Sequence, residues 1–273
     1  MISTTYRING INMHVVIAGA GKDVLLLHGF PDTHAIWREQ IPALVAAGYR
    51  VIAPDLRGFG ATDISPEVSD YRLANLTSDV IALLDQMNID QVRLIAHDWG
   101  AVIGWDLAIK HPKRINRYIA LSVGHPTCYA TGGVMQKLKG YYIALFQLRG
   151  FAEWLCRRND WQLLAAFTRC PQEMPHWRAG LSQTGRLTAA MNYYRANLDL
   201  ILPKKRGDVH VPVLGVYSSK DIALVESQMV RSSQYCKAGW QYQRIEGVGH
   251  WMTSEAPDIV NPLLINYLNQ SFK

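Results

Sequence analysis

Val92-Arg93-Leu94-Ile95-Ala96-His97-Asp98-Trp99-Gly100-Ala101 is the stretch that decides the fold. Its first five residues form an apolar run typical of a buried strand, and a helical pattern begins at Gly100. The small side chains of Ala96, Gly100 and Ala101 permit a sharp turn from strand to helix, with the side chain of Asp98 exposed above the sheet. This pattern predicts a nucleophile elbow, a turn in which Ser usually holds the position of Asp98.

An Asp in this position changes the expected chemistry. A Ser hydroxyl must lose a proton to a base before it attacks, and it suits acyl carbons. The carboxylate of Asp98 is already ionised at neutral pH and can displace a leaving group from saturated carbon. Water must then cleave the resulting ester, which requires a base and an oxyanion hole. The alternative is a structural role in which Asp98 only caps the following helix.

The sequence on both sides of the elbow alternates apolar strands with amphipathic helices. Two alternating runs over residues 5–16 flank Asn9-Gly10, a dipeptide that favours a type I′ turn, and they predict a hairpin. Further strands are expected over residues 24–28, 50–54, 92–97, 117–122, 211–217 and 241–245, and helices over residues 35–47, 76–87, 100–111 and 254–268. This alternation predicts an α/β fold with a mostly parallel central sheet flanked by helices.

The strand pattern stops over residues 127–206, which contain helix-like stretches rich in Trp, Tyr, Phe and Arg. We predict a core domain formed by residues 1–126 and 207–273, with residues 127–206 inserted as a helical cap, or lid. The cap is expected over the carboxyl ends of the strands, where open parallel sheets bind ligands. Candidates for lining an apolar pocket, each with plain core packing as the alternative, are Trp105, Trp154, Trp161, Trp177 and Trp251.

Two residues after later strands complete a candidate catalytic triad. Asp221 follows the strand expected over residues 211–217, and His250 follows the last strand in a loop that contains Gly247 and Gly249. Nucleophile, acid and His is the chain order expected for a triad built on this kind of elbow. Asp221 is expected to orient His250, and His250 to activate water. The alternatives are a helix cap for Asp221 and a structural role for His250.

The loop His28-Gly29-Phe30-Pro31-Asp32 follows the first parallel strand. In this arrangement the loop supplies one backbone donor of the oxyanion hole, and the residue after the nucleophile supplies the other. We therefore expect the N–H groups of Phe30 and Trp99 to bind the reacting group. The alternative for the loop is an ordinary turn, with a cis bond between Phe30 and Pro31.

Composition indicates an ordinary globular chain. Hydrophobic residues make up 49% of the 273 residues and charged residues 18%, so the chain can bury a large core. No run approaches the roughly 18 apolar residues of a membrane span, and the first residues lack a signal-peptide pattern. The four cysteines lack metal-binding spacing, which indicates reduced thiols and a cytoplasmic location. We expect no metal and no organic cofactor.

The net charge of +6 is unevenly distributed. Residues 128–206 contain 12 Lys and Arg against 4 Asp and Glu, a local charge of +8. These basic residues are scattered among apolar residues at helical spacing, which favours a solvated helical face over a nucleic-acid-binding surface. We therefore expect no nucleic-acid partner. The sequence leaves the oligomeric state open, and a homodimer is among the states that it allows.

Four motifs together resemble the α/β-hydrolase-fold epoxide hydrolases, Asp-nucleophile enzymes close to the haloalkane dehalogenases. They are His28-Gly29-Phe30-Pro31, Pro54-Asp55-Leu56-Arg57-Gly58-Phe59-Gly60, His97-Asp98-Trp99-Gly100 and Gly249-His250-Trp251. The match spans nearly the whole chain, with Ala96 standing where Gly is common in the elbow. The resemblance implies a cofactor-free hydrolase that acts on the ether bond of a small-molecule epoxide. The product would be a vicinal diol, formed through a hydroxyalkyl ester of Asp98.

The resemblance also implies two cap tyrosines that hold and protonate the epoxide oxygen. Asn192-Tyr193-Tyr194-Arg195 matches one site and assigns the role to Tyr194, with Tyr193 as the fallback. At the other site, alignment on Phe146-Gln147 favours Tyr142 over Tyr141. Two phenol donors at the developing alkoxide would lower the barrier to ring opening. The alternative is that these tyrosines are core or rim aromatics.

Two other functions are compatible with parts of this pattern. A haloalkane dehalogenase uses the same Asp nucleophile, but it must hold a halide with side-chain N–H donors, and Phe30 has none. A ligand-binding protein on an inactive hydrolase fold would have no need for Asp221, His250 and both tyrosines. The sequence favours the epoxide hydrolase and leaves the natural epoxide open.

Overall fold

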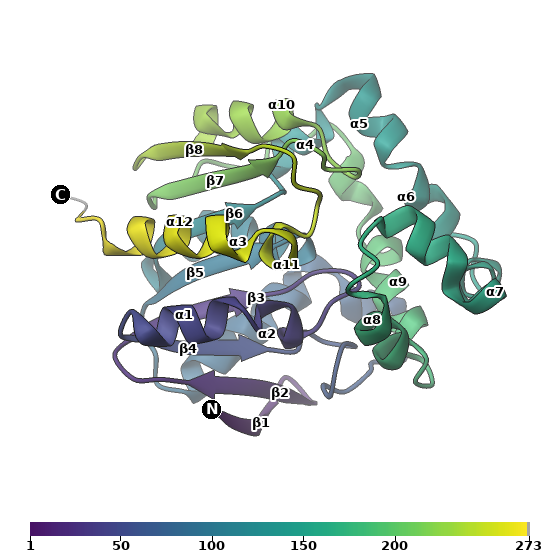
Figure 1. Cartoon of the computed structure of the whole chain (residues 1–273), viewed down its shortest axis with the longest axis horizontal. Helices are drawn as coiled ribbons and strands as arrows, with labels where there is room; N and C mark the ends of the chain where they lie inside the picture. Colours follow the sequence, from purple (N-terminus) through teal and green to yellow (C-terminus); the bar gives the residue numbers. More distant parts are fainter. Residues whose placement is uncertain (272–273) are drawn as a thin grey trace.

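A central sheet of eight strands organises the computed structural model, which describes residues 1–271 (Figure 1). The strands are β1 (Ile2–Ile8), β2 (Ile11–Ala18), β3 (Lys22–Leu27), β4 (Tyr49–Pro54), β5 (Val92–His97), β6 (Ile115–Leu121), β7 (Val213–Ser218) and β8 (Trp240–Ile245). Their order across the sheet is β1-β2-β4-β3-β5-β6-β7-β8. β1, β2 and β4 pair antiparallel, and all pairs from β4 to β8 are parallel. The predicted mostly parallel sheet is confirmed.

The predicted hairpin forms because its turn residues accept left-handed backbone angles. Asn9 and Gly10 have φ values of 43° and 81°, and β1 and β2 pair in register on either side of them. Side chains on β2 alternate between buried and partly exposed positions for most of its length, as expected for an outer antiparallel strand. The central strand β5 is instead almost entirely buried, and β3 is buried over its last four residues.

Helices cover both faces of the sheet. The core helices are η1 (His34–Trp37), α1 (Gln40–Ala46), η2 (Val68–Tyr71), α2 (Leu73–Gln86), α3 (Trp99–Lys110), η3 (Pro112–Arg114), α10 (Glu226–Val230), η5 (Arg231–Tyr235), α11 (Met252–Glu255) and α12 (Pro257–Asn269). In Figure 1, α1 and α12 lie in front of the sheet, and α2 and α3 lie behind it. Among residues 1–271, no helix is long and apolar enough to cross a bilayer.

A helical segment, residues 126–201, lies between β6 and β7 and contains no strand in the described chain. It comprises α4 (Pro126–Ala130), α5 (Gly133–Lys139), α6 (Tyr141–Phe146), α7 (Phe151–Thr168), α8 (Met174–Leu181), α9 (Arg186–Ala196) and η4 (Leu198–Ile201). Figure 1 shows this segment beyond the carboxyl ends of the parallel strands, at the right of the molecule. The end of the sheet where ligands bind in open α/β folds is therefore covered by helices.

Two expected helices are interrupted. The helix expected over residues 254–268 is divided into α11 and α12 at Ala256, whose φ and ψ are −144° and 55°. The break follows from Pro257, because a proline disfavours the helical conformation in the residue before it. The helix expected over residues 35–47 is likewise divided into η1 and α1.

Candidate active site

Asp98 lies at the turn between β5 and α3 in a backbone conformation that few L-residues adopt. Its φ and ψ are 50° and −121°, and strain of this kind is concentrated at functional turns. Two glycines provide the necessary space. A Cβ atom on Gly29 would collide with the Asp98 carboxylate, and one on Gly100 would collide with the carbonyl oxygen of Leu27 at the end of β3. The turn therefore has the sharp geometry of an elbow.

The two carboxylate oxygens of Asp98 have different surroundings. The backbone N–H of Phe30 donates a hydrogen bond of 2.6 Å to Oδ1. Oδ2 lies 3.7 Å from Nε2 of His250. Trp99, the first residue of α3, lines the same cavity as Asp98. Oδ1 is thus held by the loop after β3, and Oδ2 is the oxygen that faces the imidazole of His250.

His250 is held by partners on two sides. Its Nδ1 lies 2.8 Å from Oδ2 of Asp221, and its carbonyl oxygen accepts a 2.9 Å hydrogen bond from Nε2 of His97. The other oxygen of Asp221 accepts the backbone N–H groups of Ala223 and Leu224 at 2.8 and 2.9 Å. The structure therefore brings together all three predicted triad residues, in the order nucleophile, imidazole, acid.

The charges of this group are coupled. Burial acts to lower the pKa of His250, but the charge and hydrogen bond of Asp221, with those of Asp98, raise it to about 10. Burial acts in the opposite direction on Asp98, yet the hydrogen bond and charge of His250 hold the pKa of that carboxyl below its usual 3.8. At neutral pH the resting site therefore holds an imidazolium beside an ionised Asp98.

This raised pKa predicts a loss of stability at alkaline pH. The free energy of unfolding should fall as the pH rises, because the stabilisation by the imidazolium is complete below 6.5 and is lost as the pH passes through about 10. Urea unfolding across this range measures the effect. His250→Gln should flatten this part of the profile, and an unchanged slope in the variant would contradict the assignment.

Asp98 opens into a cavity between the core and the helical segment. Its walls come from the core and from the helical segment and are mostly apolar or aromatic. They include Trp99, Val123, Leu224, Tyr129, Tyr142, Ile143, Tyr194 and Leu200. A pocket with this lining suits a small apolar ligand with a few fixed polar contacts.

The helical segment places Tyr142 and Tyr194 in this cavity and turns their neighbours away from it. The rings of Tyr142 and Tyr194 are 5.6 Å apart between centroids, and Tyr194 also packs edge-on against Trp99. Tyr193 is fully buried, and its hydroxyl donates to the carbonyl oxygen of Arg57. The side chain of Tyr141 is 62% exposed. The geometry thus favours Tyr142 and Tyr194 over the two fallbacks.

Sequence reasoning missed the part played by Asp32. Its buried carboxyl accepts the indole N–H of Trp177 on α8 at 2.7 Å and that of Trp251 at 3.2 Å. Burial raises the pKa of Asp32 to about 8, against the opposing effect of the hydrogen bond from Trp177. Asp32 therefore joins the loop that carries Phe30 to the helical segment and to the loop of His250. The motif around Asp32 marks the loop, but the sequence gives no sign of partners so distant in the chain.

The five tryptophans proposed as pocket-lining residues do not line the cavity of Asp98 in the described chain. Trp105 is fully buried against Tyr118 and His125 in the core, and Trp154 is half exposed on α7. Trp99, in the elbow itself, is the tryptophan that reaches this cavity. Core packing, the alternative stated for each residue, describes Trp105, Trp161, Trp177 and Trp251, which are all buried in the hydrophobic core, whereas Trp154 is exposed.

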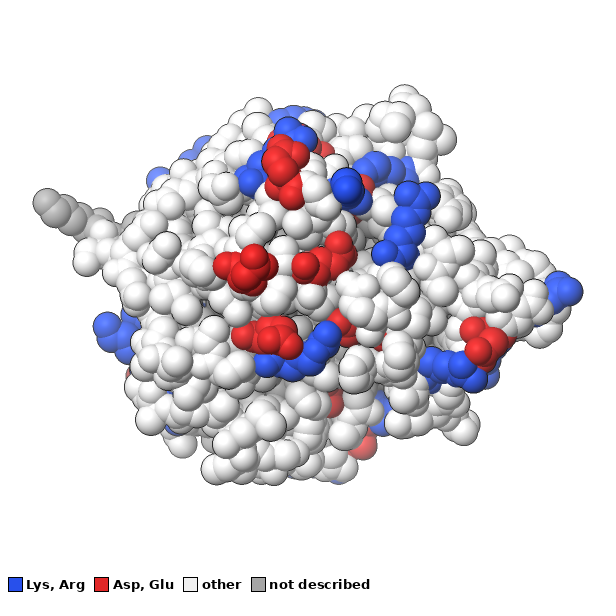
Figure 2. Space-filling view, in the orientation of Figure 1, with Lys and Arg blue, Asp and Glu red and all other residues white. Residues whose placement is uncertain are grey.

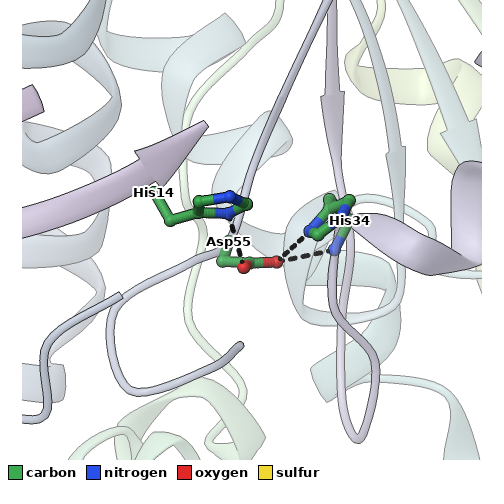
Figure 3. A group of neighbouring side chains, drawn as sticks. All are labelled: His14, His34 and Asp55. Carbon is green, nitrogen blue, oxygen red and sulfur yellow. Dashed lines mark hydrogen bonds and ion pairs between the residues drawn. The ribbon is translucent and has the colours of Figure 1, made fainter. Parts of the chain in front are cut away.

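A second cluster, His14, His34 and Asp55, contains residue types that bind metals (Figure 3). Figure 3 shows both imidazoles turned toward the carboxylate of Asp55. Nδ1 of His14 lies 2.9 Å from Oδ2, and Nδ1 of His34 lies 2.8 Å from Oδ1. The same carboxylate also accepts the backbone N–H groups of His34 and Ala61. Each oxygen of Asp55 thus accepts two hydrogen bonds, so the cluster is satisfied as a structural network joining β2, η1 and the loop after β4.

Comparison with known proteins agrees with this architecture. Residues 23–257 match the family model described as alpha/beta hydrolase fold. The chain is 35% identical to the AB hydrolase superfamily protein YfhM of Bacillus subtilis (strain 168), over 95% of both chains. It is 32% identical to Epoxide hydrolase 2 of Caenorhabditis elegans, over 97% of this chain and 79% of the relative. The crystal structure of epoxide hydrolase VrEH1 from Vigna radiata superposes with a TM-score of 0.85 at 30% identity, covering 98% of this chain and 97% of that one.

The fold, the elbow and these relatives together define the class of protein. The chain belongs to the epoxide hydrolase family of the α/β-hydrolase fold. The predicted fold class and the resemblance are confirmed, and with them the enzyme class, a hydrolase that acts on the ether bond of epoxides.

Proposed function

We propose that this enzyme converts an epoxide to a vicinal diol in two chemical steps, the first of which esterifies Asp98. Oδ2 of Asp98 attacks one epoxide carbon, and the carbon–oxygen bond of the ring breaks. The bonding electrons move to the oxygen, which takes a proton from Tyr142 or Tyr194. Burial raises the pKa of both phenols well above 10, so both are protonated and able to donate at neutral pH.

In the second step, water cleaves the ester at its carbonyl carbon. Esterification removes the charge of Asp98, and with it part of the interaction that raises the pKa of His250. The imidazolium then gives its proton to the tyrosinate left by ring opening, and the neutral imidazole, oriented by Asp221, becomes the base that takes a proton from the attacking water. The tetrahedral intermediate collapses with cleavage of the bond between the carbonyl carbon and the alkyl oxygen. The departing alkoxide takes the remaining carboxyl proton and leaves as the diol, so that the Asp98 carboxylate and the imidazolium are restored. The N–H of Phe30 stabilises the oxyanion, because it already donates to Oδ1 of Asp98 at 2.6 Å, and the N–H of Trp99 is the second proposed donor.

The observation that supports this proposal most strongly is that Tyr142, Tyr194 and the carboxylate of Asp98 line one cavity. A panel of epoxides and haloalkanes, scored for diol and for free halide, tests it. We expect diol from epoxides and no comparable release of halide, because the paired phenols suit an oxygen leaving group. Halide release without diol formation would instead support the alternative function, a haloalkane dehalogenase.

Removing the tyrosine hydroxyls should slow ring opening specifically. Tyr142→Phe and Tyr194→Phe should each reduce the rate of ester formation by about 10²-fold or more, because the developing alkoxide loses a donor. Pre-steady-state measurement of ester formation separates this step from hydrolysis. Tyr193→Phe and Tyr141→Phe are the matched controls and should leave the rate of ester formation near wild type. A loss in the controls equal to that in the test variants would overturn the assignment.

We also propose that residues 127–206 act as a cap domain over a core of residues 1–126 and 207–273. The supporting observation is that one wall of the cavity comes from the helical segment and the other from the core. Cys128, Cys156, Cys170 and Cys236 are free and buried. Free thiols suit a reducing compartment, which supports the proposed cytoplasmic location.

A further inference from the structure

Large apolar side chains are exposed along one edge of the helical segment. Each side chain in this group is at least half exposed, although apolar residues of this size are usually buried. The group, called the apolar edge below, consists of Val134, Met135, Leu138, Tyr141, Leu148, Phe151 and Trp154. These residues belong to α5, α6, the loop that follows and the start of α7, which line the side of the segment away from the sheet (Figure 1). An exposed concentration of this kind indicates an interaction surface.

Basic residues outnumber acidic ones around the apolar edge, where the exposed carboxylate of Asp160 on α7 is paired with Arg178. From Thr131 to Arg158 the sequence contains one carboxylate, Glu153, and its side chain is buried in an ion pair with Arg195. The exposed cations among the same residues are Lys137, Arg149, Arg157 and Arg158. Arg158 lies over the ring of Trp154, 5.1 Å from its centroid. Figure 2 shows an uncharged surface at the outer end of α5 and basic side chains where α5 and α6 meet.

We propose that the apolar edge docks the enzyme on the surface of an anionic lipid bilayer. Apolar and aromatic side chains enter the boundary between headgroups and acyl chains, and the flanking cations bind the acidic headgroups. Exposed Trp and Tyr suit this boundary because each has an apolar ring and a polar group. The proposal concerns docking on one leaflet, with the chain remaining outside the hydrocarbon core.

A second copy of the chain is a poorer occupant of this surface. In a two-fold dimer the same patch meets itself. Lys137, Arg149, Arg157 and Arg158 would then face a patch that exposes no carboxylate between Thr131 and Arg158. Charge complementarity therefore favours a partner that is negatively charged over its whole area, as an anionic bilayer is.

Docking at this edge would bring the membrane close to an entrance of the active site. An open groove between α5, α6 and η4 is lined mainly by apolar residues, including Tyr141, Leu198 and Leu202. It shares Tyr129, Ile143 and Ile201 with the cavity of Asp98, so the two spaces adjoin. If the proposed function is accepted, an apolar epoxide dissolved in the bilayer could reach Asp98 through this groove. The docking itself does not rest on that function.

Co-sedimentation of the full chain with vesicles tests the proposal. The wild type should bind phosphatidylcholine vesicles that contain phosphatidylglycerol, bind pure phosphatidylcholine more weakly, and be released by salt. Met135→Glu combined with Trp154→Glu should weaken binding at least about tenfold, because it places two charges in the apolar edge. The matched control is Val230→Glu combined with Ile259→Glu, which adds the same charge at similarly exposed apolar positions of the core.

Several results would overturn docking. One is that the wild-type protein stays in the supernatant at low salt. Another is that the control variant loses as much binding as the variant of the apolar edge. The third is that the protein forms a dimer that only the variant of the apolar edge disrupts. Thermal unfolding of both variants checks that they fold, and Lys137→Gln with Arg157→Gln provides an independent reduction of charge that should also weaken binding. Asp98→Asn protein should bind vesicles like the wild type, which separates this result from the proposed reaction.

Discussion

Replacing His250 by Gln is expected to stop the enzyme after its first half-reaction, with Asp98 esterified. Ester formation needs the carboxylate and the tyrosines, whereas ester hydrolysis needs the base. The variant should therefore consume about one equivalent of epoxide per site and then turn over at least about 10²-fold more slowly. Mass spectrometry should find the mass of one epoxide added to the peptide that contains Asp98.

His125→Gln is the matched control for this experiment. His125 is also a buried histidine, but it stacks on Tyr235 and lies outside the cavity of Asp98. Its replacement should lower stability and leave multiple turnover intact. Steady turnover by the His250 variant, with an unmodified Asp98 peptide during the reaction, would remove His250 from the hydrolytic step.

Asp98→Asn is expected to abolish ester formation. An amide is a far weaker nucleophile than a carboxylate, and the loss of a covalent nucleophile can cost 10⁴-fold or more in turnover. The fold should survive, because Asn has the same shape and keeps an oxygen for the N–H of Phe30. Rapid-mixing kinetics would measure the step, with mass spectrometry confirming that Asn remains at this position.

Asp106→Asn is a control of the same chemistry at another buried carboxylate. Asp106 on α3 accepts hydrogen bonds from Thr77 of α2 and from Lys110, and it does not line the cavity of Asp98. The Asp106→Asn variant should keep the epoxide hydrolase activity of the wild type. Asp98→Asn protein that formed diol at a rate near that of the wild type would show that water attacks the epoxide directly.

Local motifs and chain order made the core of the site predictable. The strand, the small residues and Asp98 are adjacent in sequence, so one ten-residue stretch defines the elbow. Asp221 and His250 follow strands whose carboxyl ends lie at the same edge of a parallel sheet, which brings distant residues together without knowledge of side-chain contacts. Placing Tyr142 and Tyr194 needed the family resemblance, because helical spacing alone does not distinguish either from its neighbour.

Contacts between distant segments were not predictable. The carboxyl of Asp32 meets indoles 145 and 219 positions away in the sequence, and no pattern near Asp32 points to either. Which tryptophans line the cavity of Asp98 was not predictable, because composition says which residues are bulky and apolar but not which surface each one covers. The division of the C-terminal helix was readable in principle from Pro257, since a proline often begins a helix.

Isotope labelling in a single turnover tests the central claim, that a carboxylate oxygen attacks the epoxide. Enzyme in excess over epoxide would react in water enriched in heavy oxygen, and the diol and the Asp98 peptide would be analysed by mass spectrometry. The account predicts that the diol carries ordinary oxygen donated by Asp98 and that the solvent label appears on Asp98. Heavy oxygen in the diol from the first turnover, with Asp98 unlabelled, would contradict it.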